Sequence, residues 1–97
     1  MITGYIVRVR WYTEDVNKEQ SDMLIGGMLF TFNGELPGLT VIKGRGVWKG
    51  GQENSLVIEF IGDMDYDKAH EIAEYIKGVN GQESVLMTIE PILAELV

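Results

Sequence analysis

The residues of this chain that are best equipped for chemistry gather in one short segment, residues 44–55, whose sequence is GRGVWKGGQENS. It contains four glycines and the cations Arg45 and Lys49, with the indole of Trp48 between them. Glycines leave backbone amides accessible, arginine forms paired hydrogen bonds with phosphate, and an indole ring stacks on nucleobases. The segment is therefore a candidate for binding a nucleotide or another anionic small molecule.

The glycines of this segment do not complete a known phosphate-binding loop. A dinucleotide-binding loop lies between a strand and the start of a helix, whereas a strand follows here, and the chain has no Gly-Lys-Ser/Thr sequence. The simpler interpretation is a twisted or bulged strand that leads into a hairpin, where Gly44 and Gly46 permit close approach of another chain segment. We favour this interpretation, with core packing as the simplest role of Trp48, and keep an anion site on the hairpin as the alternative.

Two further groups join the candidate ligand-binding residues. Arg8 and Arg10 lie in a strand-like segment near the start of the chain, and Gln82 and Glu83 stand where the last predicted strand begins. The second pair either satisfies backbone groups at the strand end, which we favour, or binds donor groups of a base or ribose.

No group of residues predicts catalysis or metal binding. The acids of the segment 63–67 (DMDYD) resemble a calcium loop, but Lys68 occupies the position where such a loop needs glycine, so we interpret them as residues that begin a helix. His70, the single histidine, falls on the polar side of that helix and is predicted to be a surface residue. We therefore expect no metal, no cofactor and no catalytic residue.

The periodicity of apolar residues predicts six elements. Strands are expected over residues 4–12, 39–42, 56–61 and 84–90, the last of them stopped by Pro91. A first helix is expected over about residues 19–32 with Asn17 as its N-cap, although Gly26-Gly27 leaves a strand over 23–32 as the alternative. A second helix begins at the acids of 63–67 and ends at Gly78.

The order β-α-β-β-α-β predicts an α+β fold of the ferredoxin-like kind, a four-stranded antiparallel sheet with two helices on one face. The first and third strands are expected in the middle of the sheet. The face without helices should then carry Arg8, Arg10, Tyr12, Val57, Glu59, Ile61, Leu86, Thr88 and Glu90. This mixture of apolar and charged side chains is typical of a covered interface.

Length, charge and composition exclude several classes of protein. A length of 97 residues predicts a single domain over 1–97, and its small core makes a homodimer or higher homo-oligomer an expected state. The net charge of −7 disfavours binding to duplex nucleic acid or anionic membranes. There are no cysteines, no secretory signal pattern and no apolar run near the roughly 20 residues that a membrane helix needs, so we expect a cytoplasmic protein.

Residues 37–92 show a pattern that resembles an uncharacterised family of small phage and bacterial proteins. The pattern is a Gly-x-Thr strand, a Gly-x-Trp turn, a Glu-x-Ser-Leu strand, a helix and a final Gln-Glu-Ser-Val strand. The matching positions are Gly38, Thr40, Gly46, Trp48, Glu53, Ser55, Gln82, Glu83, Ser84 and Val85. The resemblance implies a ferredoxin-like fold and a phage or prophage setting, hence the host cytoplasm, and it implies no activity and no catalytic residues.

Three functions remain as hypotheses. The first is a non-catalytic phage-type binding protein that sequesters an anionic small molecule, such as a nucleotide signal of host immunity, through Arg45, Trp48 and Lys49. The second is a protein-interaction module that acts through the open sheet face. The third, which we rank lowest, is a cofactor-free oxidase of the dimeric α/β-barrel kind, which would depend on His70 or Tyr12.

Overall fold

The computed structural model describes the backbone of residues 3–97, and the side chains of these residues apart from 3–5 and Trp48. The secondary-structure elements follow the predicted order. They are β1 (Thr3–Glu14), α1 (Lys18–Thr31), β2 (Thr40–Trp48), β3 (Gly51–Gly62), α2 (Tyr66–Val79) and β4 (Leu86–Glu95). The predicted ferredoxin-like α+β fold is confirmed.

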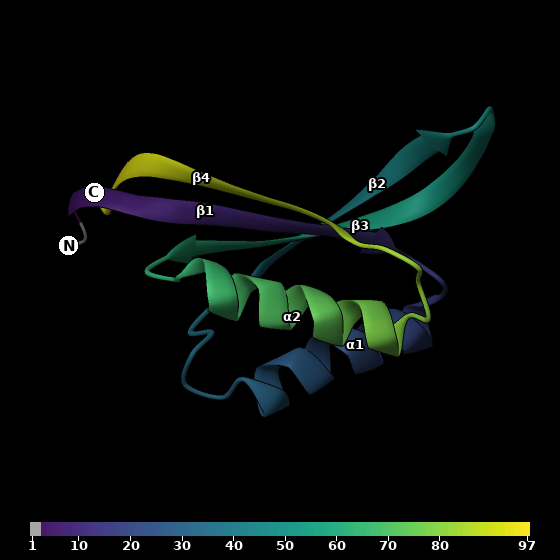
Figure 1. Cartoon of the computed structure of the whole chain (residues 1–97), viewed down its shortest axis with the longest axis horizontal. Coiled ribbons are helices and arrows are strands. Elements are labelled where there is room, and N and C mark those ends of the chain that lie inside the picture. Colours follow the sequence, from purple (N-terminus) through teal and green to yellow (C-terminus); the bar gives the residue numbers. More distant parts are fainter. Residues whose placement is uncertain (1–2) are drawn as a thin grey trace.

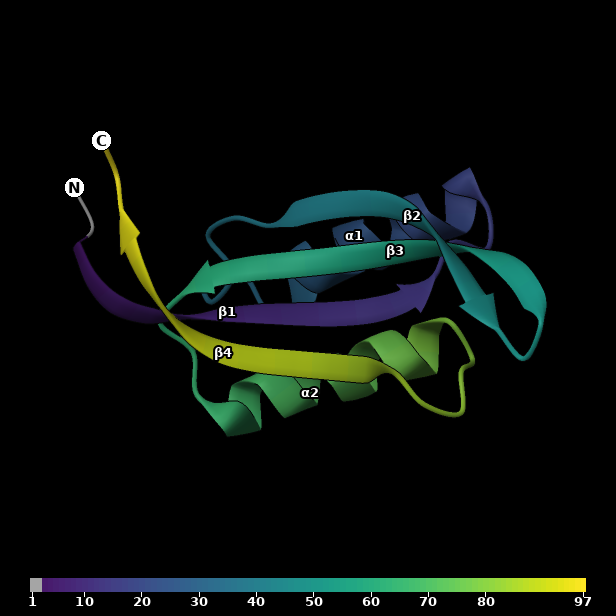
Figure 2. The same ribbon diagram turned by 90° about the horizontal axis from the view of Figure 1, so that it is seen from above.

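The four strands form one antiparallel sheet in the order β2-β3-β1-β4, with β1 and β3 in the middle as predicted. Both helices lie on one side of this sheet and leave the other side open (Figure 1). Viewed onto the sheet, the hairpin between β2 and β3 lies at the opposite end of the molecule from the start of β1 and the end of β4 (Figure 2). The sheet therefore has one covered face, one open face and two unlike ends.

The core lies between the sheet and the helices. Along β1, Val9, Trp11 and Thr13 are buried and alternate with residues that point to the open face, as the period of a strand requires. The indole nitrogen of Trp11 donates a hydrogen bond to the carbonyl oxygen of Ala69 at 3.0 Å. This bond fixes α2 over β1 without leaving a polar group unpaired in the core.

Helix α1 forms despite its two glycines. The Asn17 side chain caps it by accepting a hydrogen bond from the Gln20 amide at 2.8 Å, so the helix is confirmed and the alternative strand is wrong. Gly26 faces open space, whereas a Cβ at Gly27 would collide with the hydroxyl of Tyr75 on α2. Gly27 therefore lets the two helices approach closely.

Helix α2 begins as the acids of residues 63–67 predict. Asp65 is the N-cap and accepts a hydrogen bond from the Lys68 amide at 2.8 Å. The buried residues of α2 recur at spacings of three and four and face the sheet; they are Ala69, Ile72, Ala73 and Ile76.

Three strands run further than predicted, and the first of them, β2, continues to Trp48 instead of ending near residue 42. β4 continues through Pro91, which we expected to end it, because β4 is an edge strand and proline is tolerated there. β3 starts at Gly51 rather than near residue 56, so the polar segment 51–55, expected to be a loop, is paired with β2. Within residues 3–97, no helix is long and apolar enough to cross a membrane.

Candidate functional site

The glycine-rich segment forms the end of a long hairpin. Trp48 pairs with Gly51, and the two residues between them, Lys49 and Gly50, have positive φ angles of 49° and 79°. Two consecutive positive φ angles are the signature of a tight two-residue hairpin turn whose twist matches that of the strands. The predicted hairpin is confirmed.

The end of this hairpin extends beyond the rest of the sheet. β1 pairs with β3 only from Ser55 to Gly62, and the Asp15 amide after β1 donates a 3.0 Å hydrogen bond to the Asn54 carbonyl, so residues 51–53 of β3 pair with β2 alone. We call residues 45–54 the hairpin arm. It rises away from the helices at the right of Figure 1. Its side chains are therefore placed by the hairpin backbone and not by the core.

Two glycines, Gly44 and Gly46, lie in the β2 strand of the hairpin. A Cβ at Gly44 would lie 3.4 Å from the Ser55 hydroxyl oxygen, and one at Gly46 would lie 3.6 Å from Glu53 Cγ. Both distances are those of ordinary van der Waals contact, so Ser55 and Glu53 leave room for a Cβ at these two positions. Among the described residues, nothing approaches Gly44 or Gly46 unusually closely, contrary to the prediction.

A hollow of about 290 Å³ lies on the hairpin arm. It is lined by Arg45, Gln52, Glu53 and Asn54, and the Arg45 guanidinium donates a 3.2 Å hydrogen bond to the Gln52 side-chain oxygen. All four residues are exposed. The hollow thus offers a cation, a carboxylate and two carboxamides, which can donate and accept hydrogen bonds with a polar ligand. Lys49 lies at the adjacent turn, and the side chain of Trp48 is outside the described part of the structure.

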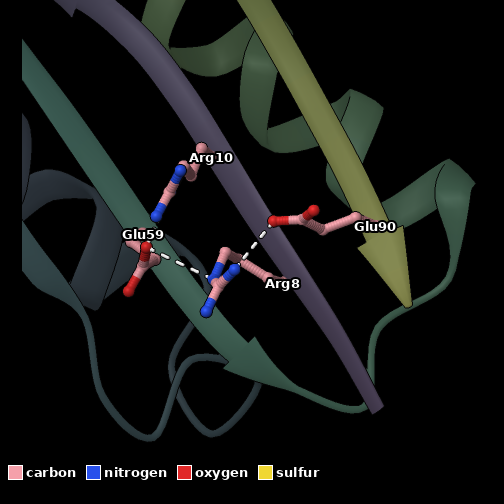
Figure 3. A network of polar contacts seen from close by, with 4 residues as sticks. All are labelled: Arg8, Arg10, Glu59 and Glu90. Carbon is pink, nitrogen blue, oxygen red and sulfur yellow. Dashed lines mark hydrogen bonds and ion pairs between the residues drawn. The ribbon is translucent and has the colours of Figure 1, made fainter. Parts of the chain in front are cut away.

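Arg8 and Arg10 lie elsewhere, at the centre of the open face (Figure 3). Arg10 Nε donates a 2.8 Å hydrogen bond to Glu59, Arg8 Nη1 donates one of 2.9 Å to Glu90, and Arg8 Nε lies 3.7 Å from Glu59. Figure 3 shows Glu59 and Glu90 reaching this cluster from the strands on either side of β1. The bond to Glu59 is the main cause that raises the pKa of Arg10 above its ordinary value. The two cations and two carboxylates balance one another.

The cluster is surrounded by apolar side chains. Ile42, Ile61 and Leu86 are all exposed on the open face, while Glu59 keeps only 12% of its side-chain surface exposed. Within the described residues, Arg8 Nε is a buried nitrogen without a hydrogen-bond acceptor. The open face therefore has the composition that we predicted, apolar side chains around paired charges.

Gln82 ties the last loop to the end of β1. Its side-chain oxygen accepts hydrogen bonds from the Thr13 hydroxyl and, at 3.3 Å, from the Glu14 amide. The neighbouring Asn80 carboxamide donates to Thr13 at 2.9 Å and to the Glu14 carbonyl at 3.1 Å. These bonds agree with the structural role that we favoured for Gln82. The contacts of Asn80 are not predictable from the sequence, because its partners are 66 and 67 residues away and no local pattern reveals them.

Glu83 is exposed and lines a separate hollow of about 300 Å³ between α2 and the start of β4. His70 lines the same hollow, is exposed as predicted, stacks on the Tyr66 ring and lies 3.7 Å from Glu74. Among residues 3–97, no group of acids and histidine is arranged to hold a metal ion.

The predicted ligand-binding residues thus lie in three places and not in one. Arg45 stands opposite Asn54 in the register of β3 and Arg8 stands opposite Ile61, seven residues apart, or about 23 Å along a strand. Gln82 and Glu83 lie in the loop before β4, beyond the other side of β1. A ligand held by one chain alone would contact one of these groups.

Comparisons with known proteins identify the fold and not the family. No family model and no curated protein sequence matches the chain. Among solved structures, a phage SAM lyase bound to S-methyl-5'-thioadenosine is similar, with a TM-score of 0.67, 19% identity, and coverage of 95% of this chain and 92% of that one. The nitrogen-regulatory PII-like protein CPII from Thiomonas intermedia K12, bound to ADP, AMP and bicarbonate, has a TM-score of 0.62, 13% identity and 99% coverage of both chains.

A third similar structure is the GlnK–ATP complex of B. subtilis, with a TM-score of 0.57, 19% identity, and coverage of 95% of this chain and 85% of that one. At these identities the likeness establishes the shared ferredoxin-like fold. The three similar structures have in common that each contains a ligand with an adenosine moiety.

Proposed function

We propose that this chain is a small non-catalytic binding protein for an anionic small molecule that contains an adenosine moiety. The observation that carries the proposal is the hairpin arm, which projects from the sheet and carries a polar hollow lined by Arg45. A guanidinium forms paired hydrogen bonds with a phosphate or carboxylate, and nearby carboxamides and a carboxylate match base and ribose groups.

The choice of an adenosine moiety rests on the three similar structures. Their ligands differ in the group attached to the nucleoside, which ranges from a methylthio group to a triphosphate. The cations of the hairpin favour the charged members of this set. We propose Arg45, Trp48 and Lys49 as the binding residues of the arm.

The other candidate residues do not lie on the hairpin arm. Arg8, Arg10, Gln82 and Glu83 reach the same ligand only if a second copy of the chain brings its open face or its last loop to the hairpin arm. The proposed binding unit is therefore a homo-oligomer, in keeping with the apolar side chains of the open face.

The test is thermal unfolding with a panel of probes: ATP, AMP, S-adenosylmethionine and S-methyl-5'-thioadenosine, with GTP as the comparison. A ligand at 100 times its Kd stabilises the folded protein by about 2.7 kcal/mol, which raises Tm by about 10 °C or more for a domain of this size. We expect a rise with at least one charged adenosine compound and none with Arg45→Ala. The matched control is Lys18→Ala, which removes an exposed cation on α1 that pairs with Asp22 and should keep the rise.

Two results would contradict the proposal. The first is an unchanged Tm with the whole panel. The second is that the protein releases S-methyl-5'-thioadenosine from S-adenosylmethionine, as measured by mass spectrometry. This release would make the chain an enzyme and not a binding protein.

A second candidate function is a protein-interaction module, which the exposed Ile42, Ile61 and Leu86 on the open face favour. If it is correct, Arg10→Glu should release a partner that a pull-down from host lysate otherwise retains, because Glu59 would then face a like charge. Retention of the same proteins by the variant would remove this candidate.

A further inference from the structure

Both edge strands of the sheet offer unpaired backbone. In the order β2-β3-β1-β4, the outer sides of β2 and β4 have no neighbouring strand, and such edges are templates for pairing with another chain. Residues 3–6 of β1 pair with β4 alone, because β3 ends opposite Val7. We call the paired residues 3–6 and 92–95 the terminal arm. It lies at the opposite end of the molecule from the hairpin arm (Figure 2).

The two edges differ in charge. Residues 40–50, which form β2 and its turn, contain Lys43, Arg45 and Lys49 and no acid, whereas β4 contains Glu90 and Glu95 and no cation. Glu90 is engaged by Arg8, while Glu95 is exposed beside the outer edge. Opposite charges on two edges of the same chain favour attraction between copies and disfavour pairing of like edges.

We propose that β2 in the hairpin arm of one copy pairs with β4 in the terminal arm of a second copy as antiparallel strands, with Arg45 opposite Glu95. In antiparallel strands the residue numbers run in opposite directions, so the same register places Val47 opposite Leu93. These two apolar side chains are 71% and 67% exposed in the single chain.

The faces of the strands agree with this register. Val41 pairs with the buried Ile58, so residues 41, 43, 45 and 47 of β2 project to the side of the helices. Met87 pairs with Trp11 and packs against the core, so residues 93 and 95 of β4 project to that same side. The charged pair and the apolar pair would therefore lie on one face. Gly46 and Ala94, both small, would meet on the other face.

The pairing has a consequence for assembly. Because the two arms lie at opposite ends of one molecule, each copy uses its hairpin arm on one neighbour and its terminal arm on another. Contacts of this head-to-tail kind generate a closed ring if the rotation closes, and a filament if it does not. We expect a discrete ring, because the strong twist seen in Figures 1 and 2 turns successive copies. This inference does not rest on the proposed function, because pairing with Glu95 engages the same Arg45 guanidinium that the proposed ligand would contact.

The experiment is a charge exchange, read by native mass spectrometry and sedimentation velocity on the full chain without added nucleotide. The wild type should have the mass of a discrete oligomer. Arg45→Glu and Glu95→Lys should each lose most of that species, and the double variant should recover it because the pair is restored with its charges reversed. The matched control is the double variant Lys18→Glu and Glu19→Lys on α1, which exchanges two charges away from both arms. It should leave the mass of the oligomer unchanged.

A variant that leaves both charges in place separates this inference from the proposed function. Leu93→Ser removes the apolar pair and should reduce the oligomer, while circular dichroism checks that the variant is folded. A monomeric wild type, an oligomer that the single variants do not change, or a double variant that stays dissociated would overturn the pairing. A failed thermal-shift panel, in contrast, would leave the mass measurements as they are and would count against ligand binding alone.

Discussion

The two faces of the sheet differ in role: one stabilises the folded chain, and the other is available for contacts with other molecules. On the side of the helices, Ile58, Ile72 and Trp11 are fully buried, and the indole N–H of Trp11 has a hydrogen-bond partner. On the open side, exposed Ile42, Ile61 and Leu86 surround charges that neutralise one another, and the hairpin arm projects beyond it. One face holds this small chain together, and the other offers surface that folding of a single copy does not use.

The largest expected effect is in the covered face. Ile58→Ala should lower the free energy of unfolding by about 2–5 kcal/mol, because it leaves a cavity in a core with few residues to spare. Ile42→Ala on the open face should cost less than about 1 kcal/mol in a single copy, because that side chain is partly exposed. Denaturant unfolding measures both. If the open face is covered in solution, the two losses become similar, and the contrast between the faces disappears.

The second expected effect compares adjacent glycines on α1. Gly27→Ala should destabilise the fold by about 1–3 kcal/mol, because the added Cβ meets the Tyr75 hydroxyl and displaces the ring that packs against Phe32. Gly26→Ala should stabilise it by about 0.5–1 kcal/mol, because that position is open and alanine favours a helix. Thermal unfolding of both variants is the measurement, and equal effects of the same sign would contradict the packing described for Tyr75.

The third prediction concerns the charges of the open face. Glu59→Gln should cost about 1–3 kcal/mol, because it removes the negative charge that Arg8 and Arg10 share at a side chain that is only 12% exposed. Glu90→Gln should cost less, because Glu90 is about half exposed and contacts Arg8 only. Denaturant unfolding at low salt measures the difference. A larger loss for Glu90 would show that Glu59 is not the centre of the cluster.

The smallest expected effect is at Lys68, which joins Glu35 and Glu71 at the surface. Its hydrogen bonds to Glu35 and then Glu71 raise the pKa of Lys68, so their contribution is fully present below the ordinary lysine pKa of about 10.4 and is lost only as the pH rises through the raised value. Lys68→Gln should therefore lower stability slightly and by the same amount from roughly pH 6 to 9. A loss that changes across this range would indicate that another group titrates with Lys68.

The parts of the fold that the sequence predicts are those with a strong local period. β1 alternates strictly, and α2 places its apolar residues at spacings of three and four, so both elements and the order of the sheet are confirmed. Helix α1 was ambiguous because Gly26-Gly27 weakens a helix, and its apolar stripe is blurred by Met23 and Phe30, which are 60% and 86% exposed. The segment 51–55 resembles a loop in sequence because it lies in or next to the exposed hairpin arm, where polar side chains stay in contact with water.

The candidate sites depend on register, which no local pattern contains. That Arg10 meets Glu59 and Arg8 meets Glu90 follows only from how β1 aligns with β3 and β4. The same holds for Gln82 and Asn80, which reach Thr13 from the far end of the chain. The hairpin arm was predictable as a candidate because glycines, cations and an indole are adjacent in the sequence.

The most direct test of the proposed binding site is to map amide chemical shifts by NMR while ATP or S-adenosylmethionine is added to the uniformly labelled protein. The account predicts that the largest changes occur at residues 44–54 of the hairpin arm, and that Arg45→Ala abolishes them. Changes confined to the hollow between α2 and β4, where His70 and Glu83 lie, or the same changes in the Arg45 variant, would contradict it.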